Sequence, residues 1–202
     1  NRGQVALSAE VVAKAPADGY TLFVAGASLW ITQLLQKTSY DVMRDFSALS
    51  SISRDVFIIA VHPSLPAKSV GELIVLAKAR AGELNYANGQ TGGTQHLATE
   101  LFKSLAGVNI VNVPYKGNTA GITALISGEV QVIINDAGLI LPQAKSGKVR
   151  ALAVTSAEPS LLVPGLPTAA ATGLPGYEAV AINAIFAPAK TPLVIIKRLN
   201  QE

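Results

Sequence analysis

The residues best suited to chemistry form a segment rich in glycine and hydroxyl groups, residues 84–94, of sequence Leu-Asn-Tyr-Ala-Asn-Gly-Gln-Thr-Gly-Gly-Thr. A short strand is predicted to end in this segment, and a helix is predicted to begin directly after it. The first turn of a helix has N–H groups without intrahelical partners and the positive end of the helix dipole, so it attracts anions. Gly89, Gly92 and Gly93 have no Cβ atom to keep a ligand from the backbone. The segment predicts recognition of a carboxylate or a phosphate.

No catalytic arrangement accompanies this segment. The glycines do not have the spacing of a P-loop or of a dinucleotide-binding loop, and no serine lies in a G-x-S-x-G elbow. His62 is expected to be a surface or hinge residue, and His96 a structural side chain bonded to a backbone carbonyl. Two histidines without any cysteine make a poor metal site. Asp136 is interpreted as a carboxylate that orients a loop, because it has no obvious partner for acid–base work. We therefore expect a binding protein rather than an enzyme, with no cofactor and no metal.

Short runs rich in β-branched residues alternate with helical runs along the chain. This order predicts an α/β protein with a mostly parallel sheet and helices on both faces. The predicted strands are Thr21–Val24, Phe57–Val61, Leu84–Tyr86, Ile110–Val113, Val130–Ile134, Ala151–Val154 and Ala179–Phe186. The predicted helices are Ser8–Lys14, Trp30–Gln36, Val70–Ala79, Gln95–Leu105, Ala120–Ser127, Leu139–Lys145 and Leu193–Asn200.

Small and hydroxyl residues follow five of the predicted strands. In α/β sheets, ligands bind beyond the carboxyl ends of the strands, so these clusters predict a polar rim around a cleft. The clusters are residues 26–28, 88–94, 116–119, 135–136 and 155–156.

Composition excludes several classes of function. Half of the residues are hydrophobic and 14% are charged, which suits a tightly packed core and argues against disorder. No apolar run approaches the ~20 residues of a membrane-spanning helix, so no direct membrane insertion is expected. The net charge of +3 comes from scattered basic residues rather than a basic stripe, so nucleic acid is not an expected partner. No signal peptide is visible and the chain begins with Asn1, so a processed product or a fragment is expected.

Several motifs, in order along the chain, resemble one family. The stretch from residue 13 to 22, Ala-Lys-Ala-Pro-Ala-Asp-Gly-Tyr-Thr-Leu, resembles its A-K-A-P-x-D-G-Y-T-L signature, and residues 85–102 resemble its N-Y-(G/A)-S-x-G-x-G-T-x-x-H-L…E-L-F segment. Residues 113–117, 147–156, 163–168, 173–178 and 187–189 continue the match. On these motifs the chain resembles the Bug-type extracytoplasmic solute receptors of tripartite tricarboxylate transporters.

The resemblance implies a two-lobed fold of the periplasmic-binding-protein type (type II) with a cleft between the lobes. Residues 1–62 and 179–202 would form the first lobe, and residues 63–178 the second. A receptor of this kind is periplasmic, captures a di- or tricarboxylate or an acidic amino acid by lobe closure, and delivers it to membrane permease subunits. The expected ligand-binding residues are Ser28, Asn88, Gly89, Thr91, Gly92, Gly93, Thr94, Asn135 and Asp136.

The chain also departs from the family pattern. The family's upstream strand and P-x-P-G-G loop are absent, its F-D-N element reads Ile134-Asn135-Asp136, and its last helices and strand are missing after Glu202. The chain is therefore expected to lack the N- and C-terminal segments of the family and to have an incomplete first lobe. Two alternatives stay open: a ligand-sensing effector module, and a truncated or degenerate receptor that binds no ligand.

Overall fold

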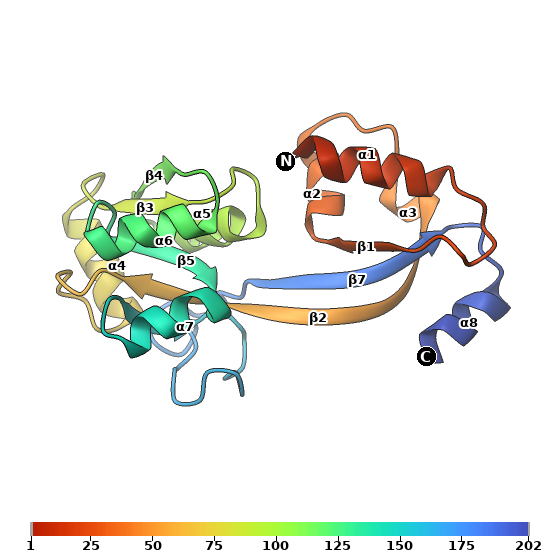
Figure 1. The fold of residues 1–202 in the computed structure, drawn as a ribbon. Coiled ribbons are helices and arrows are strands. Elements are labelled where there is room, and N and C mark those ends of the chain that lie inside the picture. The colour runs from red at the N-terminus through yellow and green to blue at the C-terminus, as the bar shows by residue number, and fades with distance from the viewer. Residues whose placement is uncertain (1, 202) are drawn as a thin grey trace. The chain divides into compact units, whose positions relative to one another are not determined.

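The computed structural model describes residues 2–201, and its contacts divide the chain into two compact units (Figure 1). Unit 1 comprises Asn1–Arg54 and Ala181–Glu202, and unit 2 comprises Asp55–Val180. The lobe boundaries expected from the sequence, 62/63 and 178/179, lie eight and two residues from these divisions, and the assignment of lobes stays a prediction. Among the described residues, none of the helices is both long and apolar enough to span a lipid bilayer.

Unit 1 has three strands in the order β1 (Phe23–Gly26), β7 (Val180–Pro188) and β2 (Phe46–Val61). β1 runs antiparallel to β7, so that Phe23 lies opposite Phe186. The ring of Phe46 lies 5.8 Å from that of Phe23 and 6.4 Å from that of Phe186, and these buried aromatic side chains form much of the core. The helices of this unit are α1 (Arg2–Ala13), α2 (Ser28–Leu35), α3 (Val42–Asp45) and α8 (Leu193–Gln201).

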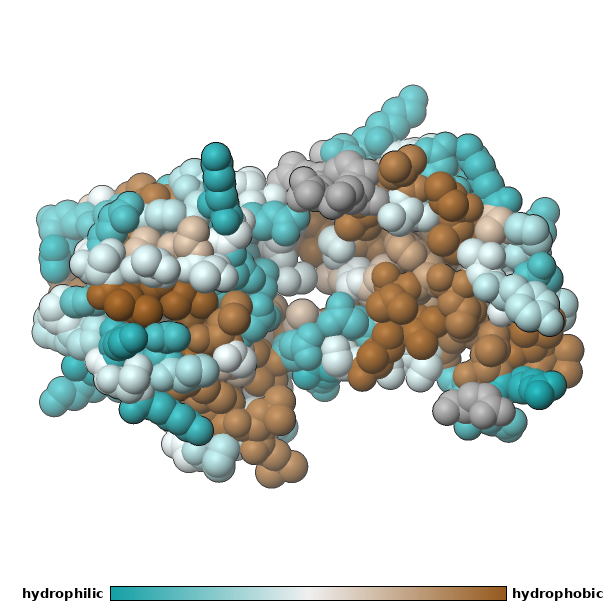
Figure 2. Space-filling model, in the orientation of Figure 1, coloured by the Kyte–Doolittle hydropathy of each residue, from teal (hydrophilic) through white to brown (hydrophobic). Residues whose placement is uncertain are grey.

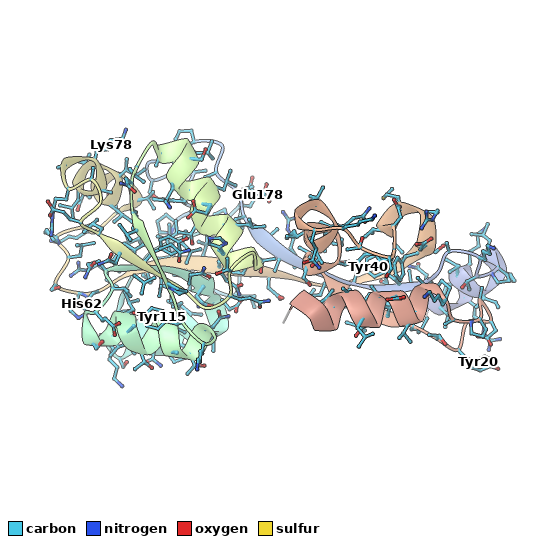
Figure 3. The ribbon with its side chains drawn as sticks, turned by 90° about the horizontal axis from the view of Figure 1, so that it is seen from above. Tyr20, Tyr40, His62, Lys78, Tyr115 and Glu178 are labelled. Atoms are coloured by element: carbon cyan, nitrogen blue, oxygen red, sulfur yellow. The ribbon has the colours of Figure 1, made fainter. Side chains whose placement is uncertain are left out.

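A buried hydrogen bond ties α2 to this core. Tyr40, labelled in Figure 3, is buried and donates its hydroxyl to the carbonyl oxygen of Leu29 at 2.8 Å. α8 contributes no buried residue, and Leu193 and Val194 are exposed. Hydrophobic side chains therefore also lie on the surface of this unit (Figure 2).

Unit 2 is a sheet with helices on both faces, as the sequence predicted. Its strands lie in the order β6, β2, β5, β3, β4, and β3 pairs in parallel with both β4 and β5. β2 is antiparallel to β5 and β6, so the sheet is mixed, with β3 to β6 running in one direction. The hydroxyl of Tyr86 donates to Glu100 of α5, whereas the side chain of its neighbour Ala87 belongs to the same hydrophobic core cluster as Ile122 of α6. Because successive side chains of a strand point to opposite faces, α5 and α6 lie on opposite faces of the sheet. The remaining elements are α4 (Val70–Ala79), β3 (Asn85–Asn88), α5 (Thr94–Ala106), β4 (Val111–Pro114), α6 (Asn118–Ser127), β5 (Val132–Asp136), α7 (Ala137–Lys145) and β6 (Arg150–Val154).

The start of α4 shows why some boundaries follow from local sequence. Ser69 Oγ accepts the N–H of Glu72 at 3.2 Å, and the Glu72 carboxylate accepts the N–H of Lys68 at 2.8 Å. This is a capping box whose second bond falls one residue earlier than in the standard form. Because the cap satisfies N–H groups that the helix leaves unpaired, α4 begins at the predicted residue Val70.

Candidate functional site

Three helices of unit 2 begin at one edge of its sheet. β3, β4 and β5 are parallel, so their carboxyl ends lie at the same edge, where α5, α6 and α7 start. None of these three helices has a side-chain cap, whereas α4, which follows the opposite edge, is capped by Ser69. No capping side chain therefore accepts the N–H groups in the first turns of these three helices, so these groups can bind other acceptors. The positive ends of three helix dipoles also lie at this edge.

The glycine loop, defined here as residues 88–94, is fastened to the loop that precedes α6. The N–H of Tyr115 donates to Asn88 O at 2.7 Å, and the N–H of Gly117 donates to Gly89 O at 3.1 Å. Inside the glycine loop, Asn88 Oδ1 accepts the N–H of Gln90 at 3.0 Å. Asn88 is almost fully buried, so its side-chain amide stabilises the loop from the interior of unit 2.

Asp136 links three separate segments of the chain. It ends β5, and its Oδ2 accepts Gln95 Nε2 at 3.0 Å and Asn118 Nδ2 at 3.4 Å. Gln95 lies in the first turn of α5 and Asn118 begins α6. The buried amide of Asn135 supports this arrangement by accepting the N–H of Asp136 at 2.8 Å. The carboxylate thus orients the starts of two helices, in the role that the sequence suggested for it.

Burial raises the pKa of the Asp136 carboxyl above its ordinary value, and the nearby Asp55 raises it further. In the folded state the ionised form is therefore disfavoured. The folded protein holds this proton to a higher pH than the unfolded chain does, so the contribution of Asp136 to stability falls as the pH rises through the folded pKa.

We expect Asp136→Asn to be more stable than the wild type at pH 7, by less than about 1 kcal/mol because the carboxyl is only half-buried. The difference should shrink as the pH falls toward the ordinary pKa of aspartate, near 4. The matched control is Asp45→Asn in unit 1. The Arg44 guanidinium and the N–H of Asp41 lower the pKa of Asp45 to about 2, so this variant should be less stable at pH 7. Urea unfolding between pH 3 and 8 measures both, and an Asp136→Asn variant less stable than the wild type at pH 7 would contradict the assignment.

The structure places the predicted ligand residues in both units. Those of the glycine loop, together with Asn135 and Asp136, lie at the carboxyl edge of the unit 2 sheet, where hydrogen bonds connect them. Ser28 belongs to unit 1, where it begins α2 after the uncapped position Ala27. Their contact with a ligand stays a prediction.

Two predicted rim residues have internal partners. Thr155 is fully buried and its Oγ1 accepts the N–H of Phe57 at 3.0 Å, and Ser156 Oγ donates to Glu158 O at 2.7 Å. These hydroxyls hold the end of β6 in place. Gln95 and Asn118, by contrast, reach the site: Asn118 belongs to the predicted rim cluster 116–119, whereas Gln95 was not predicted to lie there. The available signal was their position in the first turns of helices that begin at this edge.

Contrary to expectation, Nδ1 of His96 bonds to a backbone N–H rather than to a carbonyl. It accepts the N–H of Gly92 at 2.9 Å. Among residues 2–201, no group of three or more His, Asp or Glu side chains is gathered in a way that could hold a metal ion.

The chain is similar to several known proteins. Protein BugT of Bordetella pertussis is 33% identical over 198 residues, which cover 96% of this chain and 61% of that protein. The structure of R. palustris Rpa4515 with adipate is 38% identical with a TM-score of 0.82, covering 97% of this chain and 66% of that one. MatC (Rpa3494) from Rhodopseudomonas palustris with bound malate is 28% identical with a TM-score of 0.77, covering 97% and 67%.

The similar structures confirm the expected α/β fold of periplasmic solute-binding proteins. The chain spans about 60% of the length of the curated relatives that it matches over nearly its whole length. Residues 2–202 match the family model described as tripartite tricarboxylate transporter family receptor, TctC. This is a family of receptors rather than of enzymes. The chain therefore belongs to the receptor family of the tripartite tricarboxylate transporters.

Proposed function

We propose that this protein captures a small carboxylate, a di- or tricarboxylate or an acidic amino acid, and presents it to the permease subunits of a tripartite tricarboxylate transporter. The ligand would bind at the carboxyl edge of the unit 2 sheet, and Ser28 would contribute from unit 1. Capture would take place in the periplasm and would involve closure of two lobes, as in other hinge-bending receptors.

The observation that carries this proposal is the meeting of three uncapped helix starts at one edge. A carboxylate placed there can accept hydrogen bonds from backbone N–H groups, and bonds to an ionised acceptor are stronger than neutral ones. Gly89 and Gly93 let the glycine loop pack closely at this edge, because a Cβ atom would meet Asn118 and Gly117 at the first position and Gln90 at the second. Adipate and malate, which are named with two of the similar structures, are both dicarboxylates.

A thermal-shift screen at low salt tests this function. Mono-, di- and tricarboxylates, acidic amino acids and phosphate are compared with chloride at equal ionic strength. A ligand that binds only the folded state increases the free energy of unfolding, by about 2.7 kcal/mol at a concentration of one hundred times its Kd. The melting temperature therefore rises with the ligand concentration. A selective rise with dicarboxylates is expected. A cooperative transition that no carboxylate shifts would favour the degenerate receptor instead.

Lobe closure needs a separate readout of distance. The chain has no cysteine, so the exposed residues Met43 in unit 1 and Val75 in unit 2 can be replaced by cysteine and labelled with a donor and an acceptor dye. The bound carboxylate should change the energy transfer between these labels. A control pair at Val75 and Leu161, both within unit 2, should show no change. Ligand binding with unchanged transfer in the first pair would contradict closure.

A further inference from the structure

His96 touches the glycine loop from the helix that follows it. Gly92 has a φ of +75°, in the left-handed region that favours glycine, and its N–H donates to His96 Nδ1 at 2.9 Å. A ring nitrogen that accepts a hydrogen bond carries no proton, so the neutral ring must hold its proton on Nε2. The conformation of the loop is thus connected to the protonation of one side chain.

A partly buried network lies beside this ring. The ring of Tyr86 is stacked on that of His96 with centroids 6.5 Å apart and an angle of 21°. Tyr86 is fully buried and donates its hydroxyl to Glu100 Oε1 at 2.7 Å. Lys103 also donates to Glu100 Oε1 at 2.7 Å, and its Nζ lies 5.3 Å from the centre of the Tyr86 ring. The ring therefore has little freedom to follow the loop if the loop moves.

The groups around His96 act on its charge in opposite directions. Glu100 Oε1 lies 4.0 Å from Nε2 and favours an imidazolium, while Lys103 partly neutralises this carboxylate. The Nδ2 of Asn112 in β4 lies 3.5 Å from Nε2 and carries no charge, and with this amide turned over its oxygen accepts the Nε2 proton. The N–H of Gly92 and the positive end of α5, in whose first turn His96 lies, both oppose protonation.

We propose that His96 is a positioning residue for carboxylate binding at this edge of the sheet. Its unprotonated Nδ1 holds the glycine loop, through Gly92, in the conformation that binds carboxylate, and protonation of Nδ1 releases the loop. The proposal rests on the proposed function. An imidazolium has two donors and no acceptor, so Gly92 loses its partner when Nδ1 takes up a proton. Binding should therefore weaken as the pH falls through the range in which histidine titrates, about pH 8 to 5.

NMR of the ligand-free protein tests the first step without any binding. The chain has two histidines, so long-range proton–nitrogen spectra assign both rings with little overlap. We expect the Nε2–H tautomer for His96 at pH 7.5, and a Gly92 amide resonance that shifts with the same midpoint as the His96 ring. An Nδ1–H tautomer of His96 would overturn the proposal, and so would a Gly92 amide resonance that stays unchanged while the His96 ring resonances shift.

His62 provides an internal control in the same spectra. Its Nδ1 lies 2.7 Å from Ser64 Oγ and accepts the N–H of Ser64 at 3.2 Å, so it also accepts a hydrogen bond at Nδ1. It follows β2 at the other edge of the unit 2 sheet (Figure 3). Changes in the His62 ring resonances should not be accompanied by a change at the Gly92 amide.

Two substitutions separate the acceptor from the ring. In His96→Asn, the amide oxygen can lie near the position of Nδ1, so malate should bind within a few-fold of the wild type and lose the dependence on this titration. In His96→Leu, no acceptor remains, and the affinity for malate should fall about tenfold or more at every pH, as expected when a polar group is left unsatisfied. Calorimetry measures both, with His62→Asn as the matched control. Equal affinity of the Leu variant and the wild type would overturn the proposal.

The two proposals fail in different ways. If neither malate nor any other carboxylate binds the wild type, the proposed function fails, while the tautomer and the coupling to Gly92 are still decided by NMR. If malate binds more tightly in acid, the imidazolium attracts the ligand directly and the positioning role is wrong.

Discussion

Replacing Gly89 by alanine is expected to remove carboxylate binding and to destabilise unit 2. A Cβ atom at this position would overlap with Asn118 Oδ1 and would lie 2.7 Å from Asn118 N and 2.8 Å from the carbonyl carbon of Gly117. Two of these are backbone atoms, which cannot move aside as a flexible side chain can. The start of α6 would have to shift away from the glycine loop, and overpacking of this kind costs on the order of 2 kcal/mol.

The measurement is a pair of melting curves with and without malate. A cost of 2 kcal/mol corresponds to a fall in melting temperature of about 4–8 °C for a chain of this size. Gly138→Ala is the matched control: this residue lies in the first turn of α7 at the same edge, and a Cβ atom there meets nothing within 4 Å. The control should melt at or slightly above the wild-type temperature, because alanine favours a helix over glycine. If Gly89→Ala melted like the control and still bound malate, the close approach of the two loops would be wrong.

Local sequence signals accounted for most elements of the fold. The predicted start of the helix Val70–Ala79 was correct because Ser69 and Glu72 cap it with their own side chains, and its predicted end was correct as well. The first part of β2 was missed, since Ser47, Ser50 and Ser51 interrupt the hydrophobic pattern, and its strand character depends on pairing with β7. α3 was also missed because a four-residue helix gives no periodic pattern, although Asp41 caps it through the N–H groups of Met43 and Arg44.

The candidate site was less accessible to sequence reasoning than the fold. The polar clusters after β3 and β5 could be predicted because parallel strands place their carboxyl ends together. The bonds from Gln95 and Asn118 to Asp136 join residues 41 and 18 positions apart, and no local pattern encodes such pairs. The contact of His96 with Gly92 depends on the left-handed φ of a glycine, which the sequence permits but does not require.

The second large effect is expected at Thr155, beneath the same edge of the sheet. Its Oγ1 accepts the N–H of Phe57 and donates to Ala179 O at 2.6 Å, so it connects β6, β2 and the segment that leads to β7. Phe57 lies opposite Asp136 in the pairing of β2 with β5, so this hydroxyl also supports the strand that carries the site. In Thr155→Val the volume is kept, but the N–H of Phe57 loses its partner in a fully buried place. Such a loss costs about 1–3 kcal/mol.

Thr155→Ser separates the hydroxyl from the methyl group. Serine keeps the donor and the acceptor, so we expect this variant to lose less stability than Thr155→Val, although it leaves a small cavity. Urea unfolding gives the order of stability, and amide hydrogen exchange at Phe57 reports the bond itself. In Thr155→Val this amide should exchange faster than in the wild type, while in Thr155→Ser it should stay protected. If valine were less disruptive than serine, the methyl group rather than the hydrogen bond would hold this edge, and the support of Asp136 would have to come from packing alone.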